Sequence, residues 1–72
     1  MTNEVYWCGQ PAEDDFGVPV KDVLYDARTR HGPWALMTEE SWRDHRAAPN
    51  LGTGCGQKYE KQPDGRFLKV AG

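Results

Sequence analysis

The chain has 72 residues, of which 38% are hydrophobic, and a formal net charge of −2 at pH 7. A chain of this length buries only about 60% of the surface that it exposes when unfolded, so we expect one small domain over residues 1–72. Three Trp, three Tyr and two Phe can fill much of its core. The net charge is too small to determine by itself which class of partner the protein binds.

The first half of the chain predicts a loop followed by a β-hairpin. Residues 12–17 contain three consecutive acidic residues and a Gly, which indicates an exposed, loosely ordered loop. Residues 18–25 are rich in β-branched side chains and predict a strand, although Pro19 restricts its start to a sheet edge. Asp26 favours a turn over 26–29, and a second strand over 30–36 then completes the hairpin.

A short helix is predicted over residues 39–47. Thr38 can cap its start by accepting a hydrogen bond from a free backbone N–H, and the two Glu that follow suit the positive end of the helix dipole. Met37 and Trp42 have the spacing of a hydrophobic staple, in which the residue before the cap packs on the first turn. Pro49 cannot continue the helix.

The last part of the chain predicts a second hairpin, with strands over 57–62 and 66–70 around a Pro-Asp-Gly turn at 63–65. The glycines at 52, 54 and 56 precede a strand rather than a helix, so close backbone packing or a bend explains them better than a phosphate loop. The fold class is therefore α+β, with β-hairpins and one short helix.

No metal, cofactor or catalytic set is predicted. A structural zinc site normally takes paired ligands two residues apart, and no such pair of Cys occurs. No nucleophile, base and orienting group can be assembled from so few reactive residues, so we do not expect an enzyme. The scattered residues that could still retain zinc are Cys8, His31, His45 and Cys55.

Charge is unevenly distributed along the sequence, and this suggests two alternative binding faces. Six acidic residues and one Lys precede residue 27, whereas eight Lys or Arg and five acidic residues follow. An acidic face could dock on a basic groove of another protein. A basic face could contact nucleic-acid phosphates. The acidic candidates are Glu13, Asp14, Asp15, Asp22 and Asp26, and the basic ones are Arg28, Arg30, Arg43, Arg46 and Lys58. Trp34 and Tyr59 are expected in the core.

The amino-terminal residues lack the basic and apolar segments of a secretory signal peptide, and no run of about 20 apolar residues suits a membrane span. We therefore expect a cytoplasmic protein without a membrane partner. Thiols stay reduced in that compartment, so both cysteines are expected to be free.

Two motifs in tandem resemble a family of small, uncharacterised bacteriophage and prophage proteins. They are Gly-Pro-Trp-Ala-Leu-Met at 32–37 and Leu-Gly-Thr-Gly-Cys-Gly-Gln-Lys-Tyr at 51–59. The match covers roughly residues 5–59. The resemblance implies a zinc-ribbon-like module, in which two Cys-x-x-Cys knuckles hold the metal.

This chain departs from the family at the metal ligands. The first knuckle falls on Val5 and Cys8, and the second falls on Thr38 and Ser41, so one thiolate remains of four. The resemblance thus implies a zinc-free version of the module, with helix capping by Thr38 and aromatic packing in place of the metal.

The function expected from these features is that of a non-enzymatic phage accessory protein. It would bind a host protein or nucleoprotein complex stoichiometrically, for example as an anti-CRISPR-like inhibitor of defence. The alternatives are a zinc-free nucleic-acid-binding module and a small virion or assembly component.

Overall fold

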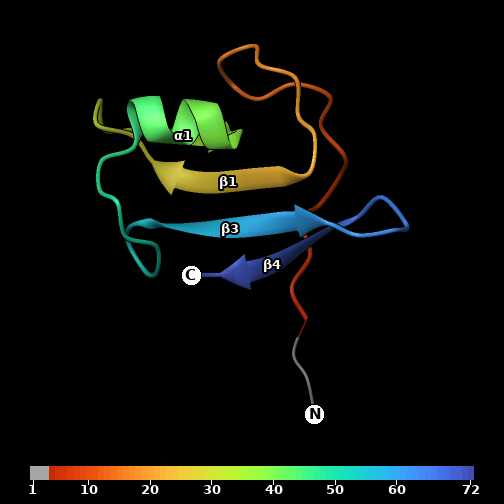
Figure 1. Ribbon diagram of the computed structural model, residues 1–72. Coiled ribbons are helices and arrows are strands. Elements are labelled where there is room, and N and C mark those ends of the chain that lie inside the picture. Colours follow the sequence, from red (N-terminus) through yellow and green to blue (C-terminus); the bar gives the residue numbers. More distant parts are fainter. Residues whose placement is uncertain (1–3) are drawn as a thin grey trace.

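The computed structural model describes residues 4–72, which form one antiparallel sheet and one helix (Figure 1). The sheet has the strand order β2-β1-β3-β4, and every neighbouring pair is antiparallel. This confirms the α+β class, the two hairpins and the single short helix. The elements are β1 (Val23–Arg28), β2 (Trp34–Met37), α1 (Glu39–His45), β3 (Gly56–Lys61) and β4 (Phe67–Ala71).

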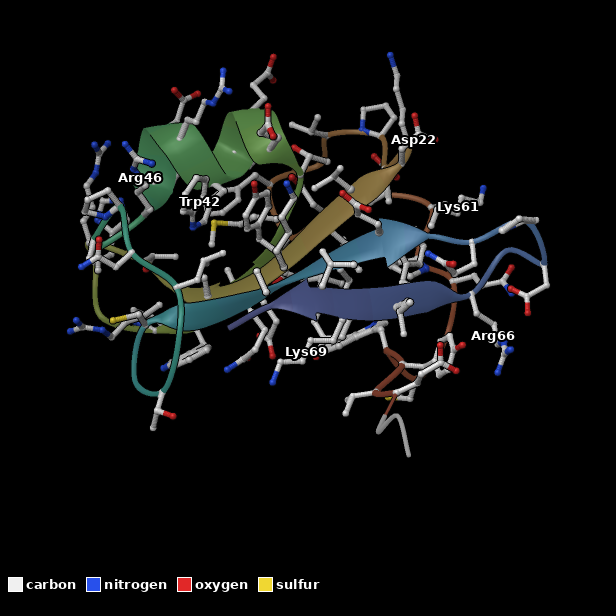
Figure 2. The ribbon with its side chains drawn as sticks, turned by 60° about the horizontal axis from the view of Figure 1, so that its bottom comes forward. Asp22, Trp42, Arg46, Lys61, Arg66 and Lys69 are labelled. Carbon is white, nitrogen blue, oxygen red and sulfur yellow. The ribbon has the colours of Figure 1, made fainter. Side chains whose placement is uncertain are left out.

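Apolar side chains pack on both faces of the sheet. On one face, helix α1 places Trp42 flat against Tyr25 of β1, with ring centroids 4.4 Å apart and an interplanar angle of 3°. Buried Met37 completes this cluster. Figure 2 shows Trp42 between the helix and the sheet and Lys69 on the opposite side of the sheet.

The second cluster lies on the face away from the helix. It consists of the buried side chains Leu24, Tyr59 and Phe67. Trp7 covers it from the amino-terminal segment and meets the Tyr59 ring edge-on at 5.7 Å. Only part of this face is covered, because no helix packs on it among the described residues.

Helix α1 begins where the sequence predicted and ends two residues earlier, at His45. The Thr38 hydroxyl accepts a hydrogen bond from Ser41 N at 3.3 Å, so the predicted cap is confirmed. The chain leaves the helix at residue 46 because it then pairs with the end of β1, through an isolated bridge between Thr29 and Arg46. None of the helices in residues 4–72 has the length and hydrophobicity needed to span a membrane.

The first hairpin is confirmed, but its boundaries are wrong by several residues. The strand predicted over 18–25 is observed over 23–28, and the turn predicted over 26–29 lies farther along, before Trp34. Asp26 and Arg28, whose polarity suggested a turn, alternate with buried Tyr25 and Ala27. A strand with one partly solvated face tolerates this alternation.

The second hairpin agrees with the sequence to within one residue at each boundary. Its turn closes with Gly65 at a φ of 91° and with a bond from Gly65 N to Gln62 O at 2.8 Å. Close packing also explains Gly56, at which a Cβ would lie 2.8 Å from the Ala27 Cα.

Both outer edges of the sheet are partly occupied by amino-terminal residues. Trp7 N donates to Phe67 O at 2.9 Å and Lys69 N donates to Val5 O at 2.7 Å, so residues 5–7 extend the sheet beyond β4. At the β2 edge, Asp15 N donates to Leu36 O at 2.9 Å, and the Asp15 Oδ2 accepts from Leu36 N at 2.7 Å.

Candidate binding surfaces

Asp14 is a buried structural carboxylate, and this corrects its assignment to an exposed acidic face. The residue is only 6% exposed. Its Oδ1 accepts hydrogen bonds from the backbone N–H groups of Phe16 and Val18, both at 2.9 Å. Its Oδ2 accepts from Thr38 N at 2.9 Å and from the Thr38 hydroxyl at 3.0 Å. Asp14 therefore ties the 12–17 segment to the start of α1.

The environment of Asp14 favours its charged form. Burial alone would raise the pKa of this carboxyl, because it removes the charge from water. The Ser41 hydroxyl and the backbone N–H groups of Thr38, Val18 and Phe16 outweigh that effect and lower the pKa to about 2. The backbone of the same segment forms a small antiparallel arm, in which Asp14 N donates to Val18 O at 2.8 Å. The segment predicted to be loosely ordered is thus held by hydrogen bonds.

The other four acidic candidates do not form one face either. Glu13 is exposed on the small arm and pairs with Pro19. Asp26 is half-buried on β1, and burial followed by the nearby charge of Asp15 raises the pKa of Asp26. Asp22 is exposed at the start of β1. Among these acidic candidates, Asp22 lines a groove on the protein surface.

That site is a surface groove of about 330 Å³ between the small arm, the start of β1 and the start of α1. Its lining combines apolar side chains with three carboxylates and the exposed Lys21. One of these carboxylates, Glu39, also forms an ion pair with Arg43 at 3.0 Å. We call this site the acidic groove; it is lined by Val18, Pro19, Val23, Asp22, Glu39 and Glu40.

The basic candidates divide into a cluster and two separate residues. Arg28, Arg30 and Arg46 come together where β1 ends and α1 ends, because Arg30 N donates to His45 O at 2.8 Å and Thr29 pairs with Arg46. We call these three residues the arginine end. It lies at the opposite end of β1 from Asp22, as the labels of Asp22 and Arg46 in Figure 2 show.

The remaining two basic candidates are engaged elsewhere. Arg43 lies on the exposed side of α1 in its ion pair with Glu39. Lys58 lies on the helix-covered face, where its Nζ is 5.8 Å from the centre of the Tyr25 ring. The five predicted basic residues therefore do not form one surface.

Trp34 was expected in the core, but it is 44% exposed. The available signal was its odd spacing from Met37, because side chains three residues apart on a strand point to opposite faces. Met37 packs under the helix, so Trp34 points to the other face. It lies directly opposite Arg28 in the pairing of β1 with β2. The expectation that Trp34 lies in the core is therefore wrong.

The candidate metal ligands are not assembled into a site. No group of three or more His, Cys, Asp or Glu is placed to hold an ion within residues 4–72. The His45 ring stacks on Phe16 at 4.0 Å and lies 6.0 Å from the ring of His31. Its Nδ1 is buried and has no hydrogen-bond partner in the described part of the chain. Cys8 is exposed and Cys55 is half-buried, and both are free thiols.

The comparisons with known proteins add no assignment to this geometry. No family model, curated protein or solved structure matches the chain.

Proposed function

We propose that this chain is a non-enzymatic, phage-type accessory protein that binds a host protein or nucleoprotein complex in a one-to-one ratio. Inhibition of a defence complex, in the manner of an anti-CRISPR protein, is its concrete form. The observation that carries the proposal is the separation of charge between the two ends of β1. The acidic groove lies toward one end and the arginine end lies at the other.

The acidic groove has the chemistry to accept a Lys or Arg side chain of a partner protein. The apolar walls of Val18, Pro19 and Val23 suit an aliphatic stem, and the carboxylates suit the cation at its tip. Asp22 and Glu40 form no ion pair with a described residue, so both carboxylates remain free for a partner. Complementary charge of this kind speeds association and fixes orientation.

We also infer that the module needs no zinc. The resemblance assigns the second metal knuckle to Thr38 and Ser41, and these are the residues that meet the Asp14 carboxylate. Hydrogen bonds thus join the loop and the helix at that corner. Val5 of the first knuckle lies beyond β4, whereas Thr38 of the second follows β2. The width of the sheet, with about 5 Å between neighbouring strands, separates these two positions.

The test is affinity purification of the tagged chain from host lysate, followed by calorimetry with the protein that co-purifies. We expect one partner and a stoichiometry near one. Replacing both free carboxylates of the groove, as Asp22→Asn with Glu40→Gln, should weaken binding about tenfold, because each removes a charge that faces the partner.

A charge-matched control separates the groove from the overall charge of the molecule. Glu13→Gln with Glu60→Gln removes the same two charges at exposed positions outside the groove. This variant should bind as the parent does. Equal weakening by both double variants would contradict the groove, and the absence of any stoichiometric partner would contradict the function.

A further inference from the structure

The arginine end concentrates positive charge that the protein itself leaves unpaired. Arg28 O accepts from Ala47 N at 3.0 Å and Arg30 N donates to His45 O at 2.8 Å, so two chain segments hold the cluster in place. None of its three arginines forms an ion pair with a carboxylate in residues 4–72. An anionic partner would therefore meet cations that no described carboxylate neutralises.

The individual side chains are well disposed to meet an extended anion. Arg28 and Arg30 are exposed on either side of buried Thr29. The guanidinium of Arg46 lies 4.6 Å from the centre of the Trp42 ring, which places it on the helix side of the sheet, whereas Arg28 is on the opposite face. The backbone contacts hold the main chain of this cluster in place, and the exposed Arg28 and Arg30 side chains become ordered on binding.

An exposed aromatic ring adjoins the same cluster. Trp34 and Arg28 are directly opposite on neighbouring strands, so their side chains stand side by side on the face away from the helix. Trp34 is 44% exposed although Leu36 on the same face packs into the second cluster. Proteins that bind single-stranded nucleic acids present exposed aromatic rings next to basic side chains. The unstacked bases pack on the rings, and the phosphates contact the cations.

We propose that the arginine end and Trp34 form a binding surface for single-stranded nucleic acid, in addition to the protein contact proposed for the acidic groove. Arg28 and Arg30 contact phosphates beside the base that stacks on Trp34. Arg46 contacts a third phosphate on the helix side, where the nucleic-acid strand passes the end of β1. A duplex keeps its bases paired and stacked, so it cannot use Trp34 and binds through phosphates alone. Asp26, two residues before Arg28 on the same face, repels phosphates and limits the surface on its inner side.

The direct test is fluorescence anisotropy of a labelled 20-nucleotide oligo-dT and of a 20-base-pair duplex, titrated with the full chain. We expect the single strand to bind more tightly than the duplex. Three phosphate contacts predict a slope of about −2 for the logarithm of affinity against that of salt concentration. Binding should therefore weaken about 20-fold between 50 and 200 mM salt.

Two variants and a matched control locate the surface. Arg28→Gln with Arg30→Gln should reduce the salt slope to about −0.7, because one phosphate contact remains. Trp34→Ala should weaken single-strand binding about tenfold and leave duplex binding unchanged. Lys61→Gln with Arg66→Gln removes the same charge at exposed positions outside the acidic groove, far from the arginine end, and should have little effect. Circular dichroism verifies that each variant is folded.

Three results would overturn the proposal. The first is absence of oligo-dT binding at 50 mM salt. The second is an equal loss of binding in the control and the arginine variants, which would reduce the effect to overall charge. The third is loss of the co-purified protein partner on Trp34→Ala with unchanged oligonucleotide binding, which would assign this surface to a protein. Failure of the acidic-groove variants affects none of these readouts, so the two proposals fail separately.

Discussion

Replacing Asp14 by Asn tests the main structural conclusion, that one buried carboxylate fastens the 12–17 segment to the helix. The carboxylate accepts four hydrogen bonds at 2.9 to 3.0 Å, two on each oxygen. An Asn side chain has one acceptor oxygen, and its NH₂ group would face N–H or O–H donors. The variant therefore loses two acceptor sites and brings donors against donors in a buried place.

The size of the effect follows from the pKa of Asp14. A carboxyl whose pKa falls from 3.8 to about 2 on folding contributes about 2.5 kcal/mol to stability at neutral pH. In a domain of 60–100 residues, a loss of this size lowers Tm by roughly 10–20 °C. We expect Asp14→Asn to show that loss at pH 7 in thermal unfolding followed by circular dichroism.

The pH dependence supplies the second readout. Because the folded-state pKa of Asp14 lies below its unfolded value, its contribution is complete above about pH 5 and disappears as the pH falls through about 2. The stability difference between parent and variant should therefore shrink across this range. Asp15→Asn is the matched control, since Asp15 is exposed and its side chain accepts one hydrogen bond; it should cost less than about 1 kcal/mol. An Asp14→Asn variant with unchanged Tm, or a difference that does not depend on pH, would refute the reasoning.

Three further predictions address the rest of the fold. Gly56→Ala should cost about 3 kcal/mol in urea unfolding, because its φ is 155° and the new Cβ would collide with Ala27; Gly54→Ala, with open space around it, should cost about 1 kcal/mol. Trp42→Ala should cost about 3–5 kcal/mol, because it removes the ring that stacks on Tyr25, and near-parent stability would contradict the core assignment. Excess chelator should leave Tm unchanged, whereas one zinc per chain by elemental analysis of native protein would disprove the zinc-free module.

The sequence was most informative where a local rule determines the structure. The Thr38 cap with its acidic first turn located α1, and the Pro-Asp-Gly turn located the hairpin of β3 and β4, because both signals act within a few residues. The position of β1 depends instead on which sheet face stays open to water. That is a property of the assembled fold, and Asp26 and Arg28 therefore looked like turn residues.

The candidate surfaces were harder to predict for the same reason. Three consecutive acids suggested an exposed loop, yet Asp14 is buried. It is buried against Thr38, a hydrogen-bond partner 24 residues away in the sequence. No local pattern predicts a contact over that separation. The arginine end likewise depends on the pairing of Thr29 with Arg46, although the sequence did select its three members. Trp34 was assigned to the core from its hydrophobicity alone. The alternation of side chains along a strand, which places Trp34 and Met37 on opposite faces, was not considered.

The partly occupied edges of the sheet affect whether the protein aggregates at high concentration. A protein that binds its target one-to-one, as we propose for this chain, must accumulate to the concentration of that target. Bare strand edges would then recruit further copies and seed fibres. Here residues 5–7 line the outside of β4, and a charged Asp15 side chain interrupts the β2 border. We therefore expect copies of this chain to stay dispersed at high concentration rather than pair edge to edge.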